Sequence, residues 1–166
     1  RKVMRMTFEE KDVLRCYFST CYELFRACEK AGCYELTARQ MDWWIGLLEE
    51  HCLTCPETPS NSRSECHAWS ALPMYELISV MGGIRREAGR PARVEVCPHL
   101  DYVPNLEGGM LTEYGLLTFR YYPKEGGTQY ELTLPEGMEG TFRGSCGQIT
   151  MLRHGKNEIW EPACLA

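Results

Sequence analysis

The sequence contains no apolar run that approaches the ~20 residues needed to span a bilayer, so we do not expect a membrane protein. It also has no excess of positive charge, because 18 lysines and arginines oppose 23 acidic residues and give a formal net charge of −5. Nucleic-acid binding requires a basic face. The one basic cluster is short and interrupted, as in a solvated segment, and consists of Arg85, Arg86, Arg90 and Arg93. We therefore expect no nucleic-acid partner.

The ten cysteines lack the spacing of a metal site. Cys52 and Cys55 form a C-x-x-C pair, but no second pair follows at the spacing of a zinc finger. Four others lie in a stretch of helical periodicity that does not bring their sulfurs to one point: Cys16, Cys21, Cys28 and Cys33. We predict no metal and no cofactor, and reduced, mostly buried thiols in a cytoplasmic protein.

The chain also lacks an initiator methionine, since it begins Arg1-Lys2, and it has no secretory signal. We therefore expect it to start inside a longer protein. Its composition, 44% hydrophobic and 25% charged, is that of a globular protein and excludes disorder. A length of 166 residues suffices for one ordinary domain or two small ones.

Residues 7–81 have the three- and four-residue periodicity of amphipathic helices. Thr7 and Glu10 fit a capping box at the start of a first helix, and the apolar stripe behind them extends to Cys28. A second helix is predicted after Thr37, with an apolar face formed by Met41, Trp44, Ile45 and Leu48. Two helices joined by a short connector would form an antiparallel hairpin.

Residues 53–64 contain two prolines, two threonines and three serines without periodicity. They predict a loop of about a dozen residues, a length at which loops between helices are often functional. A third helix is predicted from Ala68, and it ends at Gly82 and Gly83.

From Arg93 onward the period changes to two, which indicates short strands. The alternating segments are residues 93–96, 117–121 and 130–134, and glycine-bearing turns are predicted at 107–109, 125–127, 135–137 and 154–157. Strands and turns at this spacing are typical of an antiparallel sandwich. We therefore predict a helical part over residues 1–83, a linker over 84–92 and a β-sandwich over 93–166.

The densest group of polar and aromatic side chains spans the loop and the start of the third helix, residues 54–71. It contains two carboxylates, one arginine, one histidine and one tryptophan. Cleavage of a glycosidic bond needs a carboxylate to activate water or protonate the leaving oxygen, and an aromatic face suits a sugar ring. Loop carboxylates are also commonly solvated residues or helix caps, so composition leaves both interpretations open.

The segment Ser62-Arg63-Ser64-Glu65-Cys66-His67-Ala68-Trp69-Ser70-Ala71, followed by Pro73-Met74-Tyr75-Glu76-Leu77, resembles the bacterial α-L-rhamnosidases of glycoside hydrolase family 78. The family typically has Asp where Glu65 stands. Downstream, Gly83-Ile84-Arg85 and Val94-Glu95-Val96-Cys97-Pro98-His99-Leu100 are similar to the family's passage into its last domain. The resemblance implies an α+β chain, with the last helices of an (α/α)6 catalytic barrel followed by a C-terminal antiparallel β-sandwich.

The resemblance also implies an inverting glycosidase in which Glu57 is the general base that deprotonates the attacking water. By the same resemblance His67 would bind a sugar hydroxyl. Trp69 would either contact the sugar or pack beneath the loop. Arg63 and Glu65 are expected to pair with each other and so to orient the loop.

The Asp-x-x-x-Arg-x-Glu stretch that carries the family's general acid has no match in this sequence, and two or three helices cannot form six hairpins. We therefore predict the C-terminal part of an enzyme that removes terminal α-L-rhamnose from oligosaccharides or glycosides, inactive by itself. Its partners would be the rhamnoside substrate and the rest of the parent chain. Self-association through exposed apolar helix faces is also expected.

Two alternatives remain open at the level of sequence. One is a non-catalytic carbohydrate-binding or structural module, in which Tyr121, Tyr122 and Trp160 form a sugar platform, although strand aromatics more often belong to a core. The other is a related helical-barrel glycosidase that acts on a different sugar.

Overall fold

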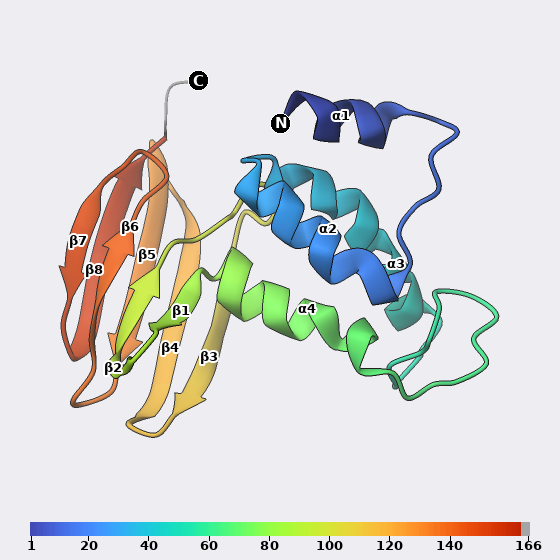
Figure 1. Cartoon of the computed structure of the whole chain (residues 1–166). Helices are drawn as coiled ribbons and strands as arrows, with labels where there is room; N and C mark the ends of the chain where they lie inside the picture. Colours follow the sequence, from blue (N-terminus) through green and yellow to red (C-terminus); the bar gives the residue numbers. More distant parts are fainter. Residues whose placement is uncertain (164–166) are drawn as a thin grey trace. The chain divides into compact units, whose positions relative to one another are not determined.

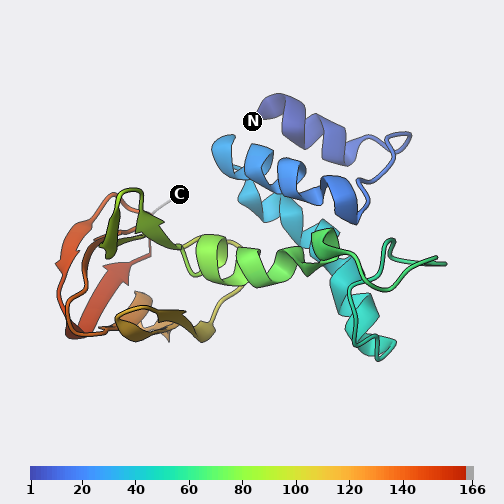
Figure 2. The same ribbon diagram turned by 60° about the horizontal axis from the view of Figure 1, so that its bottom comes forward.

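The computed structural model describes residues 1–163 and divides the chain into two compact units, Arg1–Tyr75 and Glu76–Ala166. Figures 1 and 2 show helices in the first unit and mainly strands in the second. The division falls within the third predicted helix. Residues 84–92, which we expected to be a linker, instead form strand β1 and the beginning of β2 in the second unit.

The first unit contains four α-helices and two 3₁₀ turns: α1 (Lys2–Glu9), α2 (Phe18–Lys30), the turn Tyr34–Thr37, α3 (Ala38–Glu49), the turn Ala68–Ala71 and α4 (Leu72–Tyr75). The apolar stripe predicts α2 correctly, because the three- and four-residue spacing places Cys21, Phe25 and Cys28 on one buried face. The second helix begins after Thr37, as predicted.

Aromatic side chains form the core of the helical unit. The Phe18 and Trp44 rings lie 4.5 Å apart between their centroids, and Phe25 meets Tyr34 edge to face at 6.3 Å. The buried indole N–H of Trp44 donates to the carbonyl of Ser70 at 2.7 Å. This hydrogen bond links α3 to the turn that follows the long loop, so it holds the two ends of the loop close together.

The predicted capping box at Thr7 and Glu10 is wrong. Thr7 lies inside α1, where its hydroxyl donates to the Val3 carbonyl one turn earlier at 3.0 Å. A threonine inside a helix satisfies its hydroxyl in this way and does not cap the next helix. Residues 10–17 form an irregular connector, and α2 begins only at Phe18.

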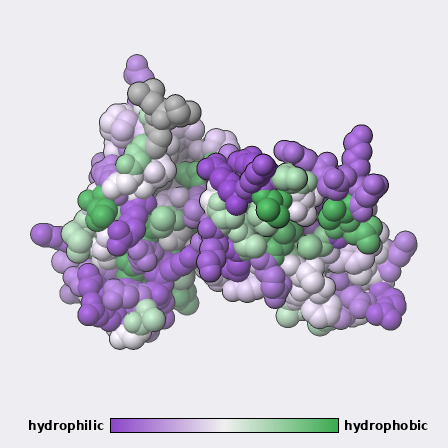
Figure 3. Space-filling model, turned by 45° about the horizontal axis from the view of Figure 1, so that its top comes forward, coloured by the Kyte–Doolittle hydropathy of each residue, from purple (hydrophilic) through white to green (hydrophobic). Residues whose placement is uncertain are grey.

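Several large apolar side chains of the helical unit are exposed, among them Val3, Leu14, Ile45, Leu48 and Leu53. Figure 3 shows hydrophobic side chains at the surface among hydrophilic ones. The predicted apolar face of the second helix is therefore only partly buried, since Trp44 is covered while Ile45 and Leu48 are not. None of the helices among residues 1–163 is both long and apolar enough to cross a membrane.

The second unit begins with the π-helix Glu76–Met81, which follows α4 in sequence, and its described part, up to residue 163, then contains eight strands. The strands are β1 (Ile84–Glu87), β2 (Arg90–Val96), β3 (Leu106–Thr112), β4 (Gly115–Lys124), β5 (Gly127–Leu134), β6 (Glu139–Arg143), β7 (Ile149–Leu152) and β8 (Gly155–Pro162). They form two four-stranded sheets, in the orders β1-β2-β6-β7 and β3-β4-β5-β8. All pairs are antiparallel except β2 with β6, which are parallel.

The two sheets share one apolar core, as expected of a β-sandwich, although the parallel pair of β2 with β6 departs from the predicted all-antiparallel arrangement. Val96 and Phe142 contribute to it from the first sheet, and Leu117, Leu132 and others from the second. Each of these positions alternates with a more exposed residue, as the period of two predicted.

One predicted turn does not exist, because residues 107–109 lie in the middle of β3. Gly108 pairs in register with Phe119 of β4, and a β-carbon at Gly108 would lie 3.0 Å from the Phe119 ring. The glycine therefore makes room for an aromatic ring and does not mark a chain reversal. The turns expected near Gly126 and Gly137 are present.

The cysteines are less buried than expected. Among the described residues only Cys21, Cys28 and Cys33 are buried, whereas Cys66 and Cys97 are exposed. Cys146 is disulfide-bonded, so the expectation that every cysteine is reduced is also wrong.

Candidate functional site

The long loop between α3 and the turn Ala68–Ala71 folds back on itself. Cys55 and Cys66 form an isolated parallel β-bridge, and the backbone N–H of His67 donates to the Cys55 carbonyl at 2.7 Å. Asn61 lies between these anchors with a φ of 50°, a left-handed conformation that asparagine tolerates better than most residues. The reversal brings Glu57 next to the residues of the Ser62–Ala71 motif.

Glu57 and Arg63 form a bidentate ion pair at this reversal. The guanidinium donates from Nη2 to Oε1 at 2.8 Å and from Nε to Oε2 at 3.3 Å. The Glu57 side chain is 20% exposed, whereas that of Arg63 is 85% exposed. Hydrogen bonds from Arg63, and its charge together with that of His67, lower the pKa of the Glu57 carboxyl. These neighbours therefore favour the ionised form of Glu57.

The predicted pair of Arg63 with Glu65 is not formed, because the loop reversal places Glu57 at the guanidinium. Glu65 is exposed and lines a hollow of about 530 Å³ beside the loop and the end of α3. Glu57, His67 and Trp69 do not line that hollow. The structure thus separates Glu65 from the other predicted site residues.

Two serines anchor the main chain of Glu57. Its backbone N–H donates both to the Ser64 carbonyl at 2.8 Å and to the Ser62 hydroxyl oxygen at 2.9 Å. The Ser62 hydroxyl in turn donates to the Ser64 carbonyl at 2.6 Å. Sequence reasoning assigned these serines no role, although hydroxyl groups close to a loop carboxylate are a recognisable signal for a turn of this kind.

Trp69 and His67 form the aromatic side of the site. Their rings lie 4.4 Å apart between centroids, tilted by 38°, and the indole N–H of Trp69 donates to the Glu57 carbonyl at 3.2 Å. Trp69 is nevertheless 41% exposed, so it both supports the loop and offers part of a ring face to solvent. Nδ1 of His67 is buried without a hydrogen-bond partner.

The arrangement is a preorganised carboxylate beside an aromatic face and an imidazole. Glu57, Arg63, His67 and Trp69 come together in the folded loop. Among residues 1–163, no group of three or more histidine, cysteine or acidic side chains is placed to hold a metal ion. Chemically, such a carboxylate accepts a proton from a water molecule.

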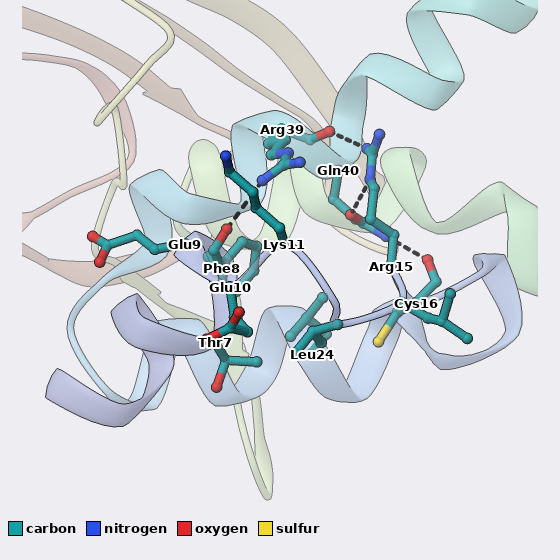
Figure 4. A pocket seen from close by; sticks show the side chains of 12 residues that line it. Thr7, Phe8, Glu9, Glu10, Lys11, Arg15, Cys16, Leu24, Arg39 and Gln40 are labelled. Atoms are coloured by element: carbon teal, nitrogen blue, oxygen red, sulfur yellow. Dashed lines mark hydrogen bonds between the residues drawn. The ribbon is translucent and has the colours of Figure 1, made fainter.

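A second hollow, of about 160 Å³, lies between the connector 10–17 and helices α2 and α3 (Figure 4). Arg15 crosses its wall: the guanidinium donates to the Gln40 side chain at 3.2 Å and to the Arg39 carbonyl, and lies 4.2 Å above the Trp43 ring. Arg39 donates to the carbonyl of Phe8 at 3.0 Å. These cations are engaged in holding the connector in place, so this hollow is a structural feature.

The sequence matches no family model, and no curated protein matches it. Among solved structures, the chain is similar to an α-L-rhamnosidase from Aspergillus terreus, with a TM-score of 0.67 and 17% identity over 90% of this chain and 20% of that one. An α-L-rhamnosidase from Dictyoglumus thermophilum gives 0.66 and 13% identity, over 83% and 20% of the two chains.

A third similar structure is the α-L-rhamnosidase of Streptomyces avermitilis complexed with L-rhamnose, with a TM-score of 0.68 and 13% identity over 81% of this chain and 17% of that one. The chain thus spans about one fifth of the length of these enzymes. At these identities the likeness establishes a shared fold alone, and that fold is shared with only a part of each α-L-rhamnosidase.

Proposed function

We propose that this chain is the C-terminal part of an inverting α-L-rhamnosidase of glycoside hydrolase family 78, and that Glu57 is its general base. The observation that carries the proposal is the bidentate ion pair that holds the Glu57 carboxylate against Arg63 on an anchored loop. The shared fold with three α-L-rhamnosidases supports the same assignment.

In this mechanism, Glu57 removes a proton from a water molecule as the water oxygen attacks the anomeric carbon of rhamnose. A carboxylic acid from the rest of the parent chain protonates the leaving oxygen. The two carboxyl groups of an inverting enzyme stand ~6.5–9.5 Å apart, which leaves room for the water between them. The chain by itself supplies one of these two groups and is therefore expected to be inactive.

The neighbours of Glu57 have defined tasks in this proposal. Arg63 keeps the carboxylate ionised and fixes its orientation through two hydrogen bonds. Trp69 holds the Glu57 main chain and presents part of its ring to the sugar. His67 binds a sugar hydroxyl through its imidazole. Each task uses a group that the loop reversal brings to one place.

The test is the Glu57→Gln variant of the full-length protein that carries this chain, assayed on an aryl α-L-rhamnoside. The amide keeps the size of the side chain but cannot accept the proton, so kcat falls by about 10²–10⁴ while KM changes little. Glu49→Gln, an exposed glutamate near the end of α3, is the matched control and retains normal turnover. Near-normal turnover by Glu57→Gln contradicts the assignment.

Two further measurements test separately which carboxylate is the base and whether the mechanism is inverting. If Glu65→Gln loses activity while Glu57→Gln has normal turnover, Glu65 and not Glu57 is the general base. The anomer released first by the unaltered enzyme, followed by NMR, is β-L-rhamnose if the mechanism is inverting. Release of the α-anomer would contradict the inverting mechanism.

A further inference from the structure

The outer face of the sheet β3-β4-β5-β8, which points away from the sandwich core, has aromatic and charged side chains. Along β4, Leu117, Phe119 and Tyr121 are buried in the core, so the residues between them point away from it. Tyr121, which the sequence suggested as part of a sugar platform, is therefore a core residue, and its hydroxyl donates to the Gly82 carbonyl at 2.9 Å. Tyr122 lies on the outer face.

A hollow of about 410 Å³ lies on this outer face. Thr118 and Thr133, which are paired across β4 and β5, contribute short side chains to it. The charged residues that line it are two acids and two bases: Glu107, Glu131, Arg120 and Lys156. The lining therefore has no net formal charge and offers hydrogen-bond donors and acceptors side by side.

These charged side chains form a fixed row across the strands. Arg120 is opposite Glu107 on one side and Glu131 on the other, and its Nε lies 3.6 Å from Glu107 Oε2. The Tyr122 hydroxyl donates to Glu131 Oε1 at 2.9 Å. Glu131 also stands directly opposite Glu158, whose carboxylate is paired with Lys156.

The adjacent row is aromatic. Tyr122, Gln129 and Trp160 are cross-strand neighbours on β4, β5 and β8. Since strands are spaced by ~4.7–4.9 Å, the two aromatic residues stand roughly 9.5 Å apart. Gln129 between them is only 6% exposed, and its amide is held by the Ile159 carbonyl at 3.1 Å and by Lys124 at 3.0 Å. Trp160 is 45% exposed.

We propose that this face binds a neutral oligosaccharide. The Arg120 guanidinium lies over the Tyr122 ring, 5.2 Å from its centroid, so Trp160 would supply the ring that packs against the apolar face of a sugar unit. Tyr122 would support Arg120, and the charged row would bond the sugar hydroxyls. The absence of net charge in the lining disfavours phosphates and nucleic acids. Its density of charged groups disfavours a protein partner, because the centres of protein interfaces are depleted in charge. This site lies in the sandwich unit and does not depend on the function proposed for Glu57.

NMR titration of the chain with neutral tetrasaccharides, cellotetraose and maltotetraose, tests the proposal, with L-rhamnose and anionic tetragalacturonate added separately. We expect backbone shifts at outward positions of β4, β5 and β8 with a neutral tetrasaccharide. Trp160→Ala and Arg120→Gln should each weaken this binding by about tenfold, the loss of one stacking or charged hydrogen-bond contact. Arg143→Gln is the matched control, since Arg143 forms a cross-strand ion pair with Glu95 at 2.6 Å on the other sheet.

Three results would overturn the proposal: no shifts on this face with either neutral tetrasaccharide, binding of tetragalacturonate alone, or equal weakening by Arg143→Gln. Shifts that L-rhamnose causes in residues 54–71 concern the Glu57 loop and not the sheet face. If the sugars shift only residues 54–71 and leave the sheet face unchanged, the oligosaccharide site is contradicted. Spectra of each variant without sugar show whether the sandwich is still folded. A folded Trp160→Ala variant with unchanged binding would also contradict the proposal.

Discussion

At the scale of single residues, the pairing of Glu57 with Arg63 determines what the loop can do. The arginine is mostly exposed and reaches over the carboxylate, which is itself four-fifths covered. Both carboxylate oxygens accept a hydrogen bond from the guanidinium. Arg63 is therefore the neighbour that most strongly favours the ionised form of Glu57, and its effect on the Glu57 pKa can be measured.

Replacing Arg63 with glutamine should raise the pKa of the Glu57 carboxyl toward its usual range. The reason is that the hydrogen bonds and the charge of Arg63 favour the ionised form of Glu57. Carboxyl-detected NMR titration of the chain measures the change directly. In the full-length enzyme, the acidic limb of the kcat/KM profile should move to higher pH, because the base then loses its charge sooner as pH falls.

Arg63→Lys is the conservative companion of this variant. It keeps the positive charge but loses the bidentate geometry, so the pKa of Glu57 should fall between the values for the glutamine variant and the unaltered chain. An unchanged pKa in Arg63→Gln would show that the ion pair does not control the carboxylate.

Phe25 in α2 is fully buried among Tyr34 and Trp44, so truncating it removes a central contact of the helical unit. Phe25→Ala should lower the free energy of unfolding by about 3–5 kcal/mol. Leu48→Ala, on the exposed part of α3, is the control and should change it by less than ~0.5 kcal/mol. Denaturant unfolding followed by far-UV circular dichroism compares the two, and equal effects would contradict the assigned core.

At the scale of elements, the sequence predicts the helices and strands whose apolar residues recur at a regular spacing. The stripe that includes Cys21 and Phe25 predicts α2, and the alternation over 117–121 and 130–134 predicts β4 and β5. The interruption between α1 and α2 could not be predicted, because Arg15 is held there by Gln40, a residue 25 positions away. Periodicity contains no information about such a contact.

The candidate site was predictable in its members but not in its pairing. The motif places Arg63, His67 and Trp69 close together in sequence. Which carboxylate Arg63 meets depends on the bridge between Cys55 and Cys66, which sets the register of the loop. Without that register, the nearer Glu65 is the natural expectation. The physical reason for the error is thus a set of backbone contacts across the loop, which the sequence does not reveal.

Gly83 lies between the π-helix and β1, where the backbone leaves no room for a β-carbon. Its φ is +70°, and a β-carbon there would lie 2.2 Å from the carbonyl carbon of Cys97, so Gly83→Ala forces the backbone to move. Gly89 has a similar φ of +75° but open space around it. Gly89→Ala should cost about 1 kcal/mol in thermal unfolding, whereas Gly83→Ala should cost roughly 3 kcal/mol or more. Equal costs would contradict the close contact.

At the scale of the whole molecule, the exposed apolar residues of the helical unit predict self-association. Leu14, Leu48 and Leu53 are among its most exposed large side chains. Exposed apolar surface of this extent favours contact with another protein surface. Sedimentation velocity over a range of concentrations should show oligomers, and a Leu14→Glu/Leu48→Glu variant should reduce them. A strictly monomeric chain at high concentration would contradict this expectation.

Chemical rescue tests most directly whether Glu57 is the base of an inverting α-L-rhamnosidase. In the Glu57→Ala variant of the full-length enzyme, the space left by the carboxylate admits azide, a nucleophile that needs no base to remove a proton. With an aryl α-L-rhamnoside whose leaving group needs little acid assistance, azide should restore turnover and yield β-L-rhamnosyl azide. Absence of rescue in a folded variant, or formation of the α-azide, would contradict the assignment of Glu57.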